Sequence, residues 1–382
     1  MSETTGAYEF LEQLRTQGSK QKPTFDSLME YLDVEAKNRG IPLRGQFELT
    51  PLCNFDCKMC YTHLTADQLH GRELLTVDQW KSLMRQAWEA GMMSVNLTGG
   101  ECLAYPGFEE LYLFLRDLGC EISVLTNGSL LDERWTAFFK EHCPHMIQVT
   151  LYGGNEDAYE RVTGHRCFQK VSENLRRAIS EDLPVVITTT PSKYSGEDIF
   201  QTVRAAKSFG VFYTVNGYLS EPKEETGRSG QDHDISVEEY AKIFRLFNEL
   251  EGFECPTIAP EKLPPPGGPY HQWTGGCGLT CKAGQSCFTI EWDGKLYPCS
   301  SIRNIWAEPL SEGFRKAWES IHERSLQWPV IPECVECPYR SACTNCAVEK
   351  ERFAEPGKQP LTLCERTRYL VQCGVKRLPA CE

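Results

Sequence analysis

The chain has 382 residues, 41% apolar and 24% charged, which is enough for about two to three domains with a large core. It carries 40 Lys and Arg residues against 53 Asp and Glu residues, a formal net charge of −13. This acidity argues against a nucleic-acid-binding protein, which needs a basic surface to displace counterions. The sequence contains 19 cysteines, an odd number that disulfide bonds alone cannot pair.

The N-terminus lacks the basic region and the apolar run of a secretory signal. No stretch approaches the ~20 consecutive apolar residues of a membrane-spanning helix. We therefore expect a cytoplasmic protein that does not contact a membrane. Thiols in that compartment are kept reduced, so clustered cysteines favour metal or redox chemistry.

Residues 1–40 predict an N-terminal helical extension. From residue 46 onward, short apolar runs alternate with amphipathic segments, as strands alternate with helices. Thr76, followed by Gln79, is typical of a capping box at a helix start. The expected strands cover 47–50, 94–97, 122–126, 146–151, 185–189 and 211–215, and the expected helices cover 76–90, 107–118, 132–141, 167–181, 197–208 and 236–250.

Six strand–helix alternations predict an α/β fold with parallel strands and right-handed crossovers over residues 41–250. The period alone does not distinguish a barrel from an open sheet, and in both the active site lies at the carboxyl ends of the strands. Residues 251–276, rich in proline and glycine, predict a linker or loop. Twelve of the 19 cysteines follow residue 254, so 277–382 is expected to form a cysteine-rich domain.

Three cysteines follow the first expected strand directly: Cys53, Cys57 and Cys60. Their spacing allows the thiolates to converge on one metal centre. An iron–sulfur cluster held by only three cysteines leaves one iron open to a substrate or cofactor. The alternative is a structural zinc site with His63 as the fourth ligand.

This C-x3-C-x2-C motif, placed after a first strand, resembles that of the radical S-adenosylmethionine (SAM) enzymes. The resemblance implies a partial (β/α)6 TIM-like barrel in which the three cysteines hold a [4Fe–4S] cluster. It also implies that Tyr61 lies near the adenine of SAM.

A second family motif should follow the second strand, and the sequence there reads Thr98-Gly99-Gly100-Glu101. Two glycines permit close approach of the backbone to a ligand, and a carboxylate pairs with an amino group. In the family this motif binds the methionine amino group of SAM. Cys102 stands where proline is usual, and it is either a functional thiol, the one candidate catalytic residue, or a small buried residue.

Further candidates lie at the next strand ends. Asn127 and Thr150 are positioned to touch the ribose or carboxylate of SAM, although each is equally well a turn residue. Arg161 stands in a loop resembling one common in the family, where it is either a solvated charge or a structural residue. The lone His165 is interpreted as structural.

The C-terminal cysteines resemble a SPASM domain, the auxiliary-cluster extension of radical SAM enzymes that modify peptides and proteins. The matching motifs are Cys-x-Ala-Gly at 281–284, Pro298-Cys299 and a run of four cysteines at 334–346, in which one gap is two residues where three is usual. The resemblance implies two auxiliary [4Fe–4S] clusters, with a pair of zinc ribbons as the alternative. One cluster would use Cys281, Cys287, Cys299 and Cys346, with Cys277 as a rival to Cys287 or an open iron site, and the other would use Cys334, Cys337, Cys343 and Cys364.

The resemblance implies an enzyme that reductively cleaves SAM to a 5′-deoxyadenosyl radical, which abstracts hydrogen from a substrate. It thereby implies SAM, three [4Fe–4S] clusters and an electron donor such as flavodoxin or ferredoxin. The SPASM resemblance implies a peptide or protein substrate, such as a ribosomally made precursor that receives a thioether, a carbon–carbon crosslink or another oxidative change. Residues 1–40 are too few for a winged-helix domain, so a separate leader-recognition protein or the barrel itself must bind a precursor.

Three other functions stay open. Sulfatase-maturing members carry an aspartate base after the Pro-Cys pair, where this chain has Ser300, a poor base. The second open function is a small-molecule dehydrogenase, because no acidic or aromatic cluster in the sequence indicates which substrate is bound. An iron–sulfur electron carrier would leave the Gly-Gly-Glu motif without a role. Eight cysteines stay outside the expected cluster ligands: Cys102, Cys120, Cys143, Cys167, Cys255, Cys277, Cys373 and Cys381.

Overall fold

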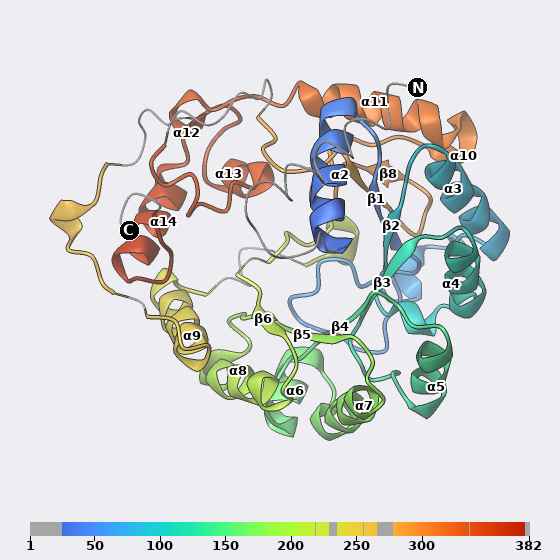
Figure 1. Cartoon of the computed structure of the whole chain (residues 1–382), viewed down its shortest axis with the longest axis horizontal. Helices are drawn as coiled ribbons and strands as arrows, with labels where there is room; N and C mark the ends of the chain where they lie inside the picture. The colour runs from blue at the N-terminus through green and yellow to red at the C-terminus, as the bar shows by residue number, and fades with distance from the viewer. Residues whose placement is uncertain are drawn as a thin grey trace, which may run out of the picture.

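The computed structural model describes residues 25–217, 219–228, 235–254, 256–265, 278–335 and 337–378. Figure 1 shows the strands in an arc with helices along its outer side. Six parallel strands lie side by side in chain order, which confirms the expected α/β fold with parallel strands. They are β1 (Arg44–Glu48), β2 (Ser94–Thr98), β3 (Glu121–Thr126), β4 (Met146–Thr150), β5 (Val185–Thr189) and β6 (Tyr213–Val215).

The sheet continues beyond β1 into the C-terminal part of the chain. β7 (Cys287–Ile290) pairs parallel with β1, and β8 (Leu296–Tyr297) pairs antiparallel with β7. Phe288 of β7 packs edge-on against Phe47 of β1, with ring centroids 5.9 Å apart. The barrel and the cysteine-rich segment therefore share one sheet and one core.

The helices that cover the outer side of the barrel end close to their expected limits. The capping box at Thr76 is confirmed, because its Oγ1 accepts from the Gln79 N–H and its own N–H donates to the Gln79 side chain. Each of these helices buries one apolar stripe. They are α3 (Val77–Glu89), α4 (Phe108–Asp117), α5 (Glu133–Glu141), α7 (Phe168–Ser180), α8 (Ile199–Ser208) and α9 (Val237–Leu250).

Three expectations about the barrel need correction. An additional helix, α6 (Glu156–Thr163), carries Arg161, which we expected in a loop. Asn155 caps this helix by accepting from the Ala158 N–H. The first strand begins and ends earlier than 47–50, and β6 begins two residues later than 211.

The C-terminal segment closes the ring between β1 and α9. Figure 1 shows it, in orange and red, running from the β1 side of the barrel toward α9. Leu370 packs in one apolar cluster with Tyr240 and Ala241 of α9. Its helices are α10 (Pro309–Glu312), α11 (Phe314–Leu326), α12 (Pro332–Val335), α13 (Ala347–Phe353) and α14 (Leu361–Gln372).

The expected extension and linker are described in part. Helix α2 (Phe25–Arg39) joins the barrel through Asp33, which accepts two hydrogen bonds from Arg44 of β1. In the stretch 256–265, Leu263 is buried against Tyr339. The described part of the linker thus packs on the cysteine-rich segment. No helix in the described ranges is both long and apolar enough to cross a membrane.

Candidate active site

The loop that carries the three cysteines rests directly on the Gly99–Gly100 turn after β2. The Gly100 N–H donates to the Thr50 carbonyl at 2.6 Å, and the Glu101 N–H donates to the Leu52 carbonyl at 3.0 Å. A Cβ on Gly99, whose φ is +141°, would lie 2.4 Å from the Thr50 oxygen, and one on Gly100 would lie 2.3 Å from the Leu52 oxygen. The two glycines are therefore required for contact between the two loops.

Two further segments hold the cysteine loop from its other side. The Asp56 N–H donates to the carbonyl of Thr163, at the end of helix α6, at 3.0 Å. Arg228 donates to the Cys60 carbonyl at 3.2 Å and forms an ion pair with Asp56. The loop that supplies the thiols is thus fixed at several points, and neither α6 nor Arg228 was expected from the sequence to take part.

Cys53, Cys57 and Cys60 line one cavity of about 250 Å³ at the carboxyl ends of the strands. Six of the seven residues expected to contact SAM also line it: Tyr61, Thr98, Gly99, Gly100, Asn127 and Thr150. The hydroxyls of Thr98 and Thr150 form no hydrogen bond with any residue that the structure describes, so they are available to a ligand. The cavity is also lined by residues that the sequence did not single out, including Gln148, Tyr152, Thr190, Asn216, Leu219 and Ser220.

The three thiols lie close enough to affect one another. Burial, together with the charges of Glu101 and Cys60, raises the pKa of Cys53 to about 12. Burial raises the pKa of Cys57 well above its usual value, and the neighbouring Cys60 and Cys53 add to that shift. Such thiols bind as thiolates only when a metal supplies positive charge, because a coordinating thiol is deprotonated by the ion. The donor set therefore fits a thiolate-held metal centre.

The geometry does not form a compact zinc site. Across the described ranges, no three His, Cys, Asp or Glu side chains are grouped closely enough to hold a single metal ion. His63, the expected fourth ligand of a zinc site, is buried, and its Nε2 lies 3.9 Å from the Asp56 carboxylate. The cysteines of an iron–sulfur cluster do not have to surround a single ion, because they bind different iron atoms and lie further apart.

The Glu101 side chain, expected to pair with the amino group of SAM, lies behind the cavity wall. Its carboxylate is fully buried and accepts from the Thr126 hydroxyl at 2.7 Å, the Asn127 N–H at 2.8 Å and the Leu103 N–H at 3.1 Å. Burial raises the pKa of Glu101, and these three hydrogen bonds oppose the shift. In this structure the carboxylate joins the turn after β2 to the end of β3.

Asn127 links the end of β3 to the cysteine loop. Its Nδ2 donates to the Asn54 side chain at 2.9 Å and lies 3.6 Å from the Cys53 sulfur. Its Oδ1 accepts from the Ser129 N–H and hydroxyl. Asn127 thus lines the cavity while its amide also orients the first of the three cysteines.

The other singled-out residues of the barrel have structural surroundings. Cys102 is fully buried, does not line the cavity and donates to the Leu125 carbonyl at 3.2 Å. Burial and the charge of Glu101 raise its pKa well above the usual value, so the group stays a thiol, as a small buried residue would. Arg161 pairs with Asp198, and His165 stacks on Phe55 with centroids 5.6 Å apart.

A buried group of charges beside Tyr61 was not expected from the sequence. The Lys223 ammonium lies 2.6 Å from Glu48 of β1 and 2.8 Å from Glu291, which follows β7. All three side chains are at most 4% exposed, and the Lys223 N–H donates to the Tyr61 carbonyl at 2.9 Å. The one signal for it in the sequence is a glutamate within the apolar stretch 47–50, because strands of parallel sheets are normally apolar throughout.

Three cysteines of the first expected auxiliary site come together. The thiol of Cys299 interacts electrostatically with those of Cys281 and Cys346, and burial raises its pKa to about 11. Cys287 pairs in register with Arg44, and its charged neighbours include Lys282, Asp33 and Arg44. Its rival Cys277 lies outside the described residues, as do Cys255 and Cys381.

The four cysteines expected to hold the other auxiliary cluster share one cavity. Cys334, Cys337, Cys343 and Cys364 line it together with Tyr339 and other residues. Burial raises the pKa of Cys364 to about 11, and the charges of the other three thiols add to this shift. Residues separated by up to 30 positions thus line one cavity.

Comparison with known proteins identifies the barrel. The model of the Radical SAM superfamily matches residues 47–206, the segment that carries the three cysteines and the Gly-Gly-Glu turn. Residues 47–206, which make up most of the barrel, are thus similar to the Radical SAM superfamily. Among curated relatives of this chain, the AdoMet-dependent heme synthase of Methanosarcina barkeri is 25% identical over 78% of this chain and 89% of the relative. The antilisterial bacteriocin subtilosin biosynthesis protein AlbA of Bacillus subtilis is 24% identical over 80% of this chain and 67% of the relative.

Solved structures extend the likeness in fold to the C-terminal segment of the chain. Streptococcus suis SuiB bound to S-adenosylmethionine superposes with a TM-score of 0.67 at 15% identity, over 95% of this chain and 88% of SuiB. Native anSMEcpe with bound AdoMet gives a TM-score of 0.60 at 17% identity, over 86% of this chain and 96% of that one. These matches confirm a partial barrel followed by a cysteine-rich domain.

Proposed function

We propose that this radical SAM enzyme binds SAM at its three-cysteine site and removes hydrogen from a peptide, most directly a ribosomally made precursor that it crosslinks or otherwise oxidises. The observation that carries the proposal is the cavity in which three thiols, the Gly99–Gly100 turn and the free hydroxyls of Thr98 and Thr150 meet. The family match supports the chemistry, and the relatives support the class of substrate.

The residues of the cavity have different roles in this proposal. Cys53, Cys57 and Cys60 would hold a [4Fe–4S] cluster, and Asn127 orients Cys53 through its amide. When bound, this cluster and SAM together supply a 5′-deoxyadenosyl radical, which belongs to the cofactors and not to the protein. Thr98 and Thr150 offer hydroxyls to the polar part of SAM, and the half-buried ring of Tyr61 and other aromatic residues keep water away from the reacting carbon.

The auxiliary sites would lie next to this chemistry. The loop after Cys299 reaches the barrel, where Ser300 hydrogen-bonds Tyr61 and the Ser301 hydroxyl lies 3.4 Å from that of Ser220. We propose that Cys281, Cys299 and Cys346, with Cys287 or Cys277, hold one auxiliary [4Fe–4S] cluster. The other would be held by the four cysteines that share a cavity: Cys334, Cys337, Cys343 and Cys364.

Several relatives support a peptide substrate. AlbA and the sporulation killing factor maturation protein SkfB, both of Bacillus subtilis, are named for peptide products, and a PqqA peptide cyclase is 30% identical over 42% of this chain. SuiB has been solved with its precursor peptide SuiA. We further propose a flavodoxin or ferredoxin as electron donor, a separate protein or the barrel itself for leader recognition, and a cytoplasmic location, where thiols are kept reduced.

A second candidate is a reaction on a haem precursor. It is favoured by the extent of the match, because the heme synthase relative is covered over 89% of its length and SkfB over 48%. Its substrate would be a porphyrin side chain in place of a peptide. Both candidates need the same three-cysteine site, so only the substrate separates them.

Anaerobic reconstitution tests the proposal. The purified chain is loaded with iron and sulfide, and its iron is counted; three clusters require about twelve iron atoms. SAM and dithionite are then added with either a candidate precursor peptide encoded beside the gene or an iron porphyrin. Formation of 5′-deoxyadenosine with a mass loss of the peptide supports the main proposal, and a change in the porphyrin alone supports the second. Zinc in place of iron, or no SAM cleavage, would overturn both.

A further inference from the structure

Lys350 is a buried cation near the cysteines that we assign to the second auxiliary cluster. It lies in α13, four residues after Cys346, and only 5% of it is exposed. Within the described ranges its ammonium group has neither a hydrogen-bond acceptor nor a carboxylate partner. The residue is buried, although its ammonium atom is not completely shielded from solvent. An opposite charge interacts more strongly with a cation in such a poorly solvated wall than with one in open water. The position therefore favours an anion.

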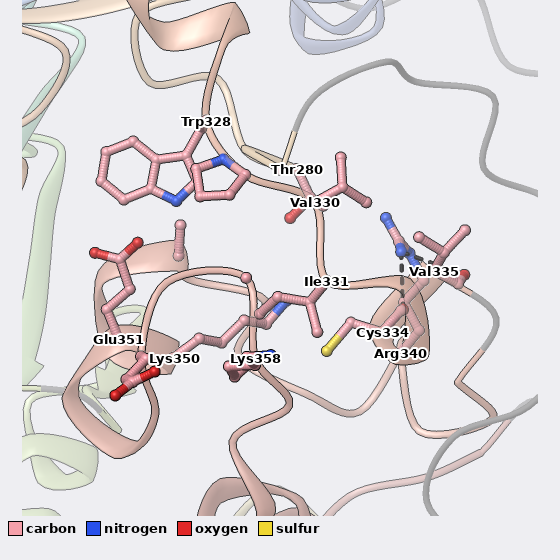
Figure 2. Close-up of a pocket in the computed structure, with 15 residues that line it drawn as sticks. Thr280, Trp328, Val330, Ile331, Cys334, Val335, Arg340, Lys350, Glu351 and Lys358 are labelled. Atoms are coloured by element: carbon pink, nitrogen blue, oxygen red, sulfur yellow. Dashed lines mark hydrogen bonds between the residues drawn. The ribbon is translucent and has the colours of Figure 1, made fainter.

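The carboxylates nearest in sequence do not supply that anion. Glu349 pairs with Arg352 at 3.0 Å. Figure 2 shows the Glu351 carboxylate directed toward Trp328, whereas the Lys350 side chain extends the other way, toward Ile331 and Cys334. The ammonium group thus faces the sulfur side of the cavity.

The cavity on that side is the one that the four cysteines share. Lys350 lines it together with Cys334, Cys337, Cys343 and Cys364. The wall of this cavity therefore brings the Lys350 side chain beside the four thiols.

Two other cations near this cavity are engaged with the backbone. Arg340 donates to the carbonyls of Cys334 at 3.1 Å and Val335 at 3.4 Å, which holds the loop that carries Cys334. The Lys376 ammonium donates to the Ala342 carbonyl at 2.6 Å, next to Cys343. Among the described residues that line the cavity, Lys350 differs because its charge is not used by the protein itself.

A cluster held by four thiolates is the anion that this position fits. Such a cluster carries net negative charge, which grows by one unit on reduction, and its potential depends on nearby charge and on exposure. A fixed cation in a poorly solvated wall stabilises the reduced form more than the oxidised form.

We propose that Lys350 supplies the counter-charge of the auxiliary cluster held by Cys334, Cys337, Cys343 and Cys364 and raises the reduction potential of that cluster. This rests on the proposed function, which assigns a cluster to these cysteines. Lys350 does not touch the substrate in this proposal. Its positive charge makes the transfer of an electron to this cluster more favourable.

The test compares midpoint potentials in the reconstituted, full-length chain. An EPR-monitored redox titration is run on the wild type and on Lys350→Met, Lys350→Arg and Lys358→Met. For Lys350→Met we expect the equilibrium constant for reduction of one auxiliary cluster to fall about tenfold, which lowers its midpoint potential by about 59 mV for one electron. Lys350→Arg keeps the charge and should restore the potential. Lys358 is exposed and lines only the neighbouring cavity. Because solvent screens its charge, its replacement should change the equilibrium constant for reduction of the cluster by less than about threefold.

Each outcome decides the proposal. If Lys350→Met loses about four iron atoms that Lys350→Arg retains, the charge is required to hold the cluster, which also supports it. Equal potentials in Lys350→Met and the wild type, or equal shifts in Lys350→Met and Lys358→Met, would overturn it. A wild type in which these cysteines hold no cluster would refute the cluster assignment itself, and the iron count separates that failure from the failure of the role of Lys350.

Discussion

The two cysteine-rich regions differ in how the chain supports them. In the barrel, Cys53, Cys57 and Cys60 sit in one loop that is fixed by backbone hydrogen bonds to the turn after β2 and to the end of α6. In the C-terminal segment, the ligands are distant in sequence and meet through packing against helices such as α13 and α14.

The surroundings of the two groups differ as well. The barrel cavity has unpaired hydroxyls and glycine backbone on its wall, as expected of a site that accepts a second ligand. The cavity of Cys334, Cys337, Cys343 and Cys364 has a fourth cysteine and a buried cation instead. In the function that we propose, the first region exposes its metal centre to SAM and the second encloses its metal centre.

The largest expected effect comes from removing a barrel thiol. Cys57→Ala should abolish SAM cleavage, because a [4Fe–4S] cluster with only two protein ligands is not retained, while the absorbance of the auxiliary clusters stays. Quantified 5′-deoxyadenosine after anaerobic reduction is the measurement. Cys102→Ala is the matched control, since this buried thiol does not line the cavity and its loss should leave cleavage within about threefold. Equal losses in both variants would contradict the assignment of the open site.

The next effect concerns the charges that join the barrel to the C-terminal segment. Lys223→Met leaves Glu48 buried without a cation, whereas Glu291 keeps its ion pair with Arg303; the change should cost about 3–5 kcal/mol of the free energy of unfolding. Chemical denaturation measures this loss. The control is Lys207→Met, because Lys207 pairs with Glu251 at 2.7 Å on the surface, where a pair contributes about 0–1 kcal/mol. Similar costs for the two variants would show that the buried group contributes nothing beyond a surface pair.

A smaller effect is expected from the glycine turn. Gly99→Ala places a Cβ 2.4 Å from the Thr50 carbonyl, and the strained backbone and the displaced loop should cost about 1–3 kcal/mol and most of the SAM affinity. Gly119→Ala is the control: Gly119 also has a positive φ, +77°, but a Cβ there meets nothing within 4 Å. SAM binding by calorimetry should be lost in the first variant only. If Gly119→Ala weakens SAM binding as much, contact between the two loops is not the reason for the glycine.

The smallest effect depends on pH. Although burial alone would raise it, the pKa of Asp33 is lowered, because Arg44 and Lys282 donate hydrogen bonds to its carboxylate. Its stabilising contribution is therefore present above the unfolded-state pKa of about 3.9 and is lost as the pH falls through the lower folded-state value. Asp33→Asn should lower the melting temperature at pH 7 and leave it nearly unchanged at strongly acidic pH. A difference that persists unchanged at acidic pH would indicate lost packing.

The parts of the fold that were predicted have local signals. The strand at 185–189 has the bounds of β5, because a run of β-branched residues between Pro184 and Pro191 defines it. The helix start at Thr76 was predicted because both partners of the capping box lie within four residues. The barrel cysteines and the Gly-Gly-Glu turn were found for the same reason.

The rest depends on contacts between distant segments. β7 has four residues, and its partner β1 lies more than 200 positions earlier, so no local pattern reveals it. Helix α6 follows two glycines, and its eight residues are too few for a clear period. Lys223 and Lys350 look like ordinary surface lysines in the sequence, and only the folded chain shows that both are buried.

The most direct test of the account is the effect of SAM on the EPR spectrum of the reduced protein. The spectrum is recorded with and without SAM for the wild type and for the variant with Cys53→Ala, Cys57→Ala and Cys60→Ala together. The account predicts that SAM changes one signal of the wild type, that this signal is absent from the triple variant, and that the auxiliary signals there do not respond to SAM. A SAM-dependent change in the triple variant would contradict it, because SAM would then bind at the C-terminal cysteines.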